Sequence, residues 1–179
     1  MRALVFLLLL CLPLGAHAND WQALDAPGAV ALMRHALAPG MSDPAGFTLG
    51  DCATQRNLDA RGRAQARAID AALRARGIRF DRVYTSQWCR CRDTAVLLSA
   101  GPVEAAPALN SFYADFTREA ASTAALRALI AATSGRRLFV THQVNISALT
   151  GRAPRSGEVL IVRMTETGTE LLGRILIAP

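Results

Sequence analysis

The sequence predicts an α/β fold, a three-layer α/β/α sandwich built around a mainly parallel central sheet. Short β-rich runs alternate with alanine-rich or amphipathic stretches along most of the chain, and this alternation is typical of parallel sheets covered by helices. Two β-rich runs, 29–34 and 137–141, are each tied to a histidine at their end, His35 and His142. Ligands of such sheets bind outside the carboxyl ends of the strands. The two imidazoles are therefore expected at one edge of the sheet.

Length and composition indicate one globular domain. The chain has 179 residues, of which 51% are hydrophobic and 19% are charged, a balance that excludes disordered, collagen-like and coiled-coil chains. The net charge of +6 is carried by arginine, since the sequence contains no lysine. A basic chain can bind nucleic acid, an anionic envelope surface or small anions. The arginines between residues 61 and 79 lack interleaved aromatic residues, which indicates a solvated helix face, so no nucleic-acid partner is expected.

The N-terminus has the features of a secretory signal peptide over residues 1–18. Arg2 is followed by an apolar run over residues 3–12, and Ala16-His17-Ala18 fits an A-x-A cleavage site. The apolar run has about half of the roughly 20 residues that a membrane-spanning helix needs. We therefore expect cleavage near Ala18, a single domain over residues 19–179 and a periplasmic or secreted protein without a stable membrane anchor.

Cysteine usage agrees with an oxidising compartment. Removal of Cys11 would leave Cys52, Cys89 and Cys91, an odd number that predicts one disulfide and one free thiol. Cys89 and Cys91 are too close in sequence to staple the fold, so Cys52 would pair with either of them. A zinc site would call for paired C-x-x-C motifs, which the sequence lacks, and no metal is expected.

The first elements lead into a long loop. Residues 21–24 are expected to cover one end of the core, and the first strand is expected at 28–33. The segment 35–55 is loop-like, and a loop of this length in a compact domain is usually functional. Its turn signals are Pro39-Gly40, Asp43-Pro44 and Leu49-Gly50-Asp51.

A helix is expected over residues 60–76. Asp59 is a plausible N-cap for this alanine-rich run, and Gly77 ends it. Arginines collect on one side of the expected helix. The apolar residues expected on its buried side are Ala64, Ala68, Ile69, Ala71 and Ala72.

The rest of the chain continues the alternation of strands and helices. The expected elements are a strand at 80–85, a helix reaching about residue 99, a minor strand at 103–106, an aromatic-rich excursion at 110–118, a helix at 122–133, a strand ending at His142, a short helix at 145–149 and a hairpin of 158–164 and 170–177.

Four motifs in order resemble the histidine phosphatase superfamily, in its phosphoglycerate mutase-like branch (branch 1). Leu32-Met33-Arg34-His35-Ala36 resembles the Arg-His-Gly signature, with alanine in place of glycine. Residues 57–66 resemble the L-x-x-x-G-x-x-Q-A stretch, and residues 86–95 resemble the S-x-x-x-R-A-x-x-T-A stretch. Thr141-His142 resembles the second histidine motif. The order and spacing agree across residues 29–161.

The resemblance implies a metal-independent phosphoric monoester hydrolase that needs no cofactor. It makes His35 the nucleophile, which would form a phosphohistidine, and makes His142 a phosphate-binding, charge-stabilising group. The residue types suit this chemistry, because a phosphate monoester resists attack until its negative charge is neutralised. Arginine binds two phosphate oxygens at once, so Arg34 and Arg90 would form the clamp.

The proton donor and further substrate contacts are less well defined by the motifs. In acid phosphatases of the superfamily an aspartate follows the second histidine, but this chain has Gln143 there. In the mutase-like branch the acid comes from a segment before the second histidine motif, which makes Asp115 the candidate, with a solvated loop carboxylate as the alternative. Arg56 and Ser86 are further candidates for substrate contact.

Three functions remain open. Exported relatives with similarly placed cysteines resemble lipopolysaccharide core heptose phosphate phosphatases, which would make the substrate an envelope sugar phosphate or another phosphorylated small molecule. A phosphotransferase or mutase of the same fold is the first alternative. A non-catalytic phosphate-binding module is the second, since Ala36 replaces the glycine of the signature. The substrate and the oligomeric state are not defined by the sequence.

Overall fold

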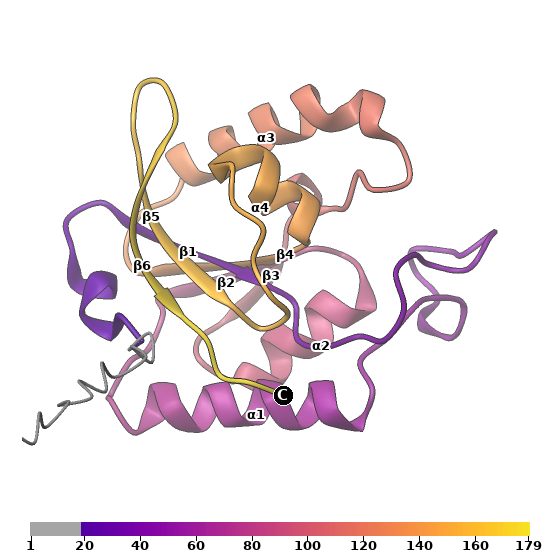
Figure 1. Ribbon diagram of the computed structural model, residues 1–179, viewed down its shortest axis with the longest axis horizontal. Coiled ribbons are helices and arrows are strands. Elements are labelled where there is room, and N and C mark those ends of the chain that lie inside the picture. Colours follow the sequence, from indigo (N-terminus) through magenta and orange to yellow (C-terminus); the bar gives the residue numbers. More distant parts are fainter. Residues whose placement is uncertain (1–18) are drawn as a thin grey trace, which may run out of the picture.

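The computed structural model describes residues 19–179, and the predicted signal peptide lies outside the described residues. These residues form a six-stranded sheet between two pairs of helices (Figure 1). The strands are β1 (Ala29–Arg34), β2 (Arg82–Thr85), β3 (Val103–Ala105), β4 (Arg137–Thr141), β5 (Val159–Met164) and β6 (Thr169–Ile175). The helices are α1 (Ala60–Arg74), α2 (Cys89–Leu98), α3 (Glu119–Ala131) and α4 (Gln143–Thr150). Short 3₁₀-helices are η1 (Trp21–Asp25), η2 (Cys52–Thr54), η3 (Pro107–Leu109) and η4 (Phe116–Arg118).

The sheet has the order β3-β2-β4-β1-β5-β6 and is mostly parallel. Strands β3, β2, β4 and β1 pair in parallel, whereas β5 is antiparallel to β1 and to β6. The expected hairpin of β5 and β6 is therefore present at one edge. None of the helices in the described part of the chain is long and apolar enough to cross a membrane.

Alternate residues of β1 bury their side chains on opposite faces of the sheet, as the period of a strand requires. Ala31 and Met33 belong to the core cluster shared with α1 and α2. Val30 and Leu32 belong to the cluster shared with α3 and α4. The predicted three-layer α/β/α sandwich is confirmed, with α1 and α2 below the sheet and α3 and α4 above it in Figure 1.

Several boundaries differ from those expected. Helix α3 begins at Glu119, three residues before the expected start, because the 3₁₀-turn of η4 leads directly into it. Helix α4 covers 143–150 and so begins right after His142. Strand β2 begins only at Arg82.

The predicted buried side of α1 is wrong. Ile69 is buried as expected, but Ala64, Ala68 and Ala71 are exposed. Larger side chains and specific contacts determine the orientation of the helix, so small alanines remain in solvent. The residues that α1 buries are Gly62, Gln65, Ala66, Ile69, Asp70 and Leu73.

The N-terminal turn of α1 is fixed against the segment that follows His35. The Asp59 carboxylate accepts a hydrogen bond from Gly62 N at 2.7 Å, which confirms Asp59 as the N-cap. Gln65 Oε1 accepts from Leu37 N at 2.9 Å, and its amide nitrogen donates to the carbonyls of Ser156 and Ile177. This single buried amide joins α1 to three separate segments beside the end of β1.

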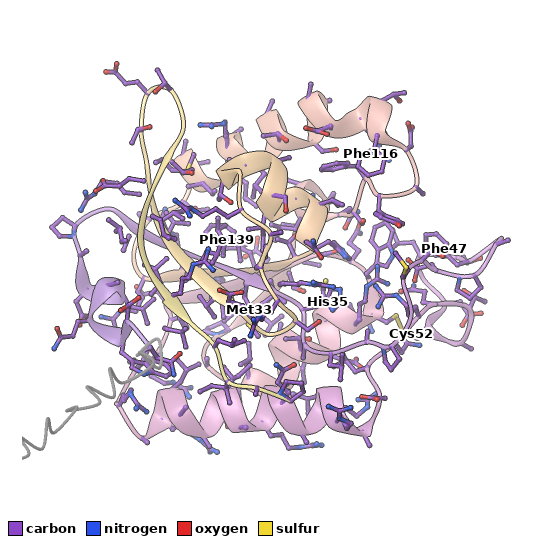
Figure 2. The ribbon with its side chains drawn as sticks, viewed as in Figure 1. Met33, His35, Phe47, Cys52, Phe116 and Phe139 are labelled. Carbon is purple, nitrogen blue, oxygen red and sulfur yellow. A yellow bond between two sulfur atoms is a disulfide. The ribbon has the colours of Figure 1, made fainter. Side chains whose placement is uncertain are left out.

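A disulfide between Cys52 and Cys89 joins the long loop to the first residue of α2. Of the two pairings left open by the sequence, the structure has Cys89 as the partner, and Cys91 is a buried free thiol. Burial raises the pKa of the Cys91 thiol to about 12, which makes it a poor nucleophile. Figure 2 labels Cys52 and Phe47 in this loop, which extends from the body of the molecule.

We predict that Gly62→Ala destabilises the protein. A Cβ at this position would lie 1.8 Å from the Leu37 carbonyl oxygen, so α1 or the segment after β1 must shift. Overpacking of this kind costs about 1–3 kcal/mol, more than the roughly 1 kcal/mol that alanine gains in helix propensity. Urea unfolding should show a lower free energy of unfolding. Gly50→Ala is the control, because a Cβ there meets no atom within 4 Å; equal stability of both variants would contradict the packing argument.

Candidate active site

Three neighbouring strand ends bring the candidate residues together. His35 N donates to the Thr141 carbonyl at 3.0 Å, and Ser86 N donates to the Val140 carbonyl at 3.0 Å. The residues that follow β1, β2 and β4 are therefore held side by side at the carboxyl edge of the parallel strands, as expected for such a sheet. Figure 2 labels His35 at this edge, on the side of the loop that carries Phe47 and Cys52.

A cavity of about 560 Å³ opens at this edge. Its wall includes apolar and aromatic side chains from the long loop and from the excursion before α3. The residues that line it are Arg34, His35, Gly40, Met41, Ser42, Asp43, Pro44, Ala45, Gly46, Phe47, Arg56, Trp88, Arg90, Ser111, Tyr113, Ala114, His142, Gln143 and Val144.

His35 is buried, and its ring is held in one tautomer. Its ring is 2% exposed, and Nδ1 lies 2.8 Å from the Ala36 carbonyl oxygen. A carbonyl only accepts, so Nδ1 carries the proton and Nε2 keeps its lone pair. Burial, followed by the positive charge of Arg90, lowers the pKa of His35 to about 3.

His142 lies against His35, with the ring centroids 5.6 Å apart in an edge-to-face arrangement. Its Nε2 is 2.9 Å from Ser86 Oγ, and its Nδ1 is 3.4 Å from Arg90 Nη2. A guanidinium only donates, so this contact favours the tautomer in which Nδ1 accepts and Nε2–H donates to Ser86. Burial, followed by the charge of Arg90, holds the pKa of His142 well below its usual value.

Three arginines share the cavity, and each is held by a terminal nitrogen. Arg34 Nη1 donates to the Pro154 carbonyl at 3.0 Å, and Arg56 Nη1 donates to the Ala38 carbonyl. Arg90 Nη1 reaches the Arg56 carbonyl at 3.3 Å. Within residues 19–179, the Nε atoms of all three arginines are buried and donate to no protein atom. A buried donor without an acceptor is costly, and these three Nε atoms are donors that the described part of the protein leaves unpaired.

The helix that carries Arg90 is connected directly to the end of β1. Ala36 N donates to Thr94 Oγ1 at 3.0 Å, and that hydroxyl donates to the Arg90 carbonyl at 2.7 Å. Ala36 is fully buried, so alanine fits where the family signature has glycine. Helices α2 and α4 begin at Cys89 and Gln143, and their positive ends add to the attraction for an anion.

Asp43 is a charged residue of the cavity that sequence reasoning missed. Its carboxylate binds Arg90 in a bidentate manner, with Oδ1 2.8 Å from Nη1 and Oδ2 3.2 Å from Nη2. Burial, the largest single contribution, raises the pKa of Asp43, but the hydrogen bond and charge of Arg90, together with hydrogen bonds from Arg56 N and Trp88, outweigh it and lower the pKa. The sequence marked Asp43-Pro44 only as a turn signal, because a partner 47 residues away leaves no local pattern.

Asp115, the predicted acid, is not brought into the cavity. It is exposed, and its carboxylate accepts from Thr117 N and Thr117 Oγ1 as the cap of η4. Its neighbours Tyr113 and Ala114 line the cavity instead. Among the lining residues, Asp43 is the sole carboxylate.

Ser86 is placed by a polar network that the sequence did not reveal. Asn110 accepts hydrogen bonds from Gln87 N at 2.9 Å and Ser86 Oγ at 3.2 Å. Trp88 N donates to Ser86 Oγ at 3.2 Å. In the described part of the chain, no group of three His, Cys, Asp or Glu side chains is placed to hold a metal ion, and independence from metal stays a prediction.

Comparisons with known proteins agree with this geometry. The model of the histidine phosphatase superfamily (branch 1) matches residues 30–119. This range contains β1, the long loop, α1 and α2, and thus Arg34, His35, Arg56 and Arg90. No curated protein sequence matches the chain.

Solved structures of the same fold have low sequence identity to the chain. A protein histidine phosphatase SixA complexed with tungstate is 19% identical, with a TM-score of 0.58 over 82% of this chain and 96% of that one. A SixA-type candidate phosphohistidine phosphatase from Agrobacterium tumefaciens is 19% identical, with a TM-score of 0.58 over 84% and 98%. A candidate α-ribazole-5′-phosphate phosphatase from Escherichia coli is 19% identical, with a TM-score of 0.59 over 84% and 97%.

The family model covers half of the chain, and it includes the strand end with Arg34 and His35 and the helix with Arg90. The structure places His142, from beyond the matched residues, against His35. The chain therefore belongs to the histidine phosphatase superfamily, branch 1.

Proposed function

We propose that the protein is a phosphatase that transfers a phosphoryl group to His35 and then to water. Family membership supports phosphatase activity. The single observation that carries the proposal is the environment of His35 Nε2. Its lone pair is free, because Nδ1 donates to Ala36, and the ring shares one cavity with Arg34, Arg56, Arg90 and His142.

The reaction would occur in two steps. The three arginines neutralise the phosphoryl oxygens while the lone pair of His35 Nε2 attacks phosphorus, so that a P–N bond forms and the bond to the leaving group breaks. The leaving group takes the bonding pair. A water molecule then attacks phosphorus, the P–N bond breaks, and its electron pair returns to Nε2. His142 would contribute through Arg90, because its Nδ1 accepts from Arg90 and its Nε2–H donates to Ser86, which helps to hold that guanidinium where negative charge develops.

The leaving group would depart with little help from a protein acid. The sole carboxylate among the lining residues, Asp43, accepts hydrogen bonds from Arg56 N, Trp88 Nε1 and two nitrogens of Arg90. A proton donor can be dispensed with when the leaving group is already a good one. The site therefore suits an aryl phosphate or a P–N bond better than an alkyl ester. SixA, one of the structural neighbours, is named as a protein histidine phosphatase.

Export to an oxidising compartment is part of the proposal. The disulfide between Cys52 and Cys89 supports it, since such bonds persist outside the cytoplasm. Cleavage after residue 18 would leave the folded domain 19–179. An envelope sugar phosphate is the second candidate substrate: the aromatic wall formed by Phe47, Trp88 and Tyr113 can pack against a sugar ring, but its poor leaving group would make it a slower substrate than an aryl phosphate.

Two other functions are distinguished by product analysis. A phosphotransferase or mutase would pass the phosphoryl group to an added alcohol in preference to water. A non-catalytic module would bind phosphate without turnover and would form no phosphohistidine.

We predict that His35→Ala abolishes hydrolysis of p-nitrophenyl phosphate, by at least about 10³-fold in kcat, because the nucleophile is lost. The wild type should yield an acid-labile phosphoprotein after quenching, and the variant should not. Arg92→Ala, an exposed residue of α2, is the control and should keep full activity. If His35→Ala keeps most of the activity, His35 is not the nucleophile.

We predict that both imidazoles of the mature domain stay neutral from about pH 5 to 8. The domain 19–179 contains only His35 and His142, and burial near Arg90 lowers the pKa of each. Histidine ring signals in an NMR titration should therefore not shift over this range, and unfolding in urea should restore a transition near the ordinary value of 6.5. A folded-state transition near 6.5 would contradict the proposed neutral nucleophile.

We predict a steep dependence on the leaving group. The value of kcat/KM should fall by about 10²–10⁴ from p-nitrophenyl phosphate to an alkyl or sugar phosphate, the range that a missing general acid accounts for. Phosphohistidine and phosphoramidate should be cleaved well. Equal rates for aryl and alkyl esters would show that a proton donor operates in the site.

A further inference from the structure

We propose that Asp43 is a positioning residue that holds Arg90, and through Arg90 holds His142, in the arrangement required to bind the phosphoryl group. The proposal rests on the proposed function, because it assigns a role within the same site. Asp43 itself would not contact the reacting atoms. It would act through the guanidinium of Arg90.

Each of the terminal nitrogens of Arg90 donates two hydrogen bonds within the protein. Its four terminal N–H groups are directed to Asp43 Oδ1 and the Arg56 carbonyl from Nη1, and to Asp43 Oδ2 and His142 Nδ1 from Nη2. The remaining donor, Nε, is buried and has no acceptor among the described residues. Asp43 thus occupies the terminal side of the guanidinium, His142 takes the second N–H of Nη2, and Nε is left as the Arg90 donor without a partner within residues 19–179.

Arg34 and Arg56 are also held at a terminal nitrogen. Each donates from Nη1 to a backbone carbonyl, and each keeps a buried, unpartnered Nε. In Arg90 a carboxylate takes the place that carbonyls take in the other two. Each of the three guanidinium groups is therefore anchored at a terminal nitrogen, and in each the Nε–H group is left without an acceptor in the described part of the chain. A carboxylate suits Arg90 because it is the most buried of the three, at 3% exposure.

Asp43 is itself held by hydrogen bonds to both of its carboxylate oxygens. Arg56 N donates to Oδ1 at 3.0 Å, and Trp88 Nε1 donates to Oδ2 at 3.0 Å. The loop around it is tied to the start of α2 by the disulfide between Cys52 and Cys89. A carboxylate whose oxygens are both engaged can fix the plane of a guanidinium, which is how residues behind a functional group set its geometry.

The consequence for His142 is a defined tautomer. With Arg90 fixed, Nη2 stays beside His142 Nδ1, and the ring proton is kept on Nε2 toward Ser86. Release of Arg90 from Asp43 would remove this preference. The tautomer of His142 is therefore a readout of the positioning role that does not depend on turnover.

We predict that Asp43→Asn lowers kcat/KM for p-nitrophenyl phosphate by about 10–100-fold, the range seen for residues that orient a functional group, with most of the loss in kcat. The leaving group of this substrate needs no proton, so the loss cannot come from removal of an acid. Nitrogen NMR of the His142 ring should show Nε2 protonated in the wild type and a mixture of tautomers in the variant. Asp51→Asn is the matched control, because Asp51 lies in the same loop, caps η2 and is exposed; it should match the wild type.

Phosphate binding to Asp43→Asn distinguishes a positioning role from simple competition for Arg90. Removal of a negative charge should strengthen phosphate binding if Asp43 merely competes for Arg90. Tighter binding of inorganic phosphate to Asp43→Asn by calorimetry, with kcat unchanged, would overturn the proposal. Phosphate binding and the tautomer are measured without turnover, so failure of the proposed function would be recognised separately, as loss of activity in the wild type.

A second variant keeps the test decisive if Asp43→Asn does not fold. Trp88→Phe keeps a ring against Phe47 and His142 but removes the N–H that donates to Asp43 Oδ2. It should also lower kcat, but by less than Asp43→Asn, about 2–10-fold, because one supporting hydrogen bond is lost while the ion pair with Arg90 remains. Full activity together with an unchanged His142 tautomer would contradict the role assigned to Asp43.

Discussion

Confinement of three guanidinium groups in one cavity is the constraint on which the site depends. Like charges repel strongly away from water, and burial together with the charge of Arg90 lowers the pKa values of Arg34 and Arg56. Backbone carbonyls and the Asp43 carboxylate hold the three groups in place. Burial, and then the same positive charge, lowers the pKa values of the two imidazoles. In the proposed reaction, one charge arrangement would thus serve both to bind an anion and to keep the nucleophile free to attack it.

The scaffold converts this constraint into a fixed geometry. Parallel pairing places the ends of β1, β2 and β4 together. Thr94 connects the end of β1 to the Arg90 carbonyl, and Gln65 connects α1 to the segment after His35. Residues of the family motifs therefore include several that never touch the cavity. They hold together the segments that form it.

Much of this was accessible from the sequence. Arg34, His35 and His142 follow or end apolar β-rich runs, and a parallel sheet brings such positions to one edge, so local pattern and topology were sufficient. Asp43 was missed because its partner Arg90 is distant in sequence, and a turn signal explained it adequately. Asp115 was chosen by its position before the second histidine, but its carboxylate caps a short helix instead.

The bridge between Cys52 and Cys89 has a consequence for where the protein can be fully assembled. It is the covalent link between the segment that bears Asp43 and the helix that bears Arg90, and thiols of this kind are kept reduced in the cytoplasm. A chain still in its compartment of synthesis would lack that link. In the proposed exported phosphatase, formation of this bond would complete the cavity only after the chain has left the cytoplasm.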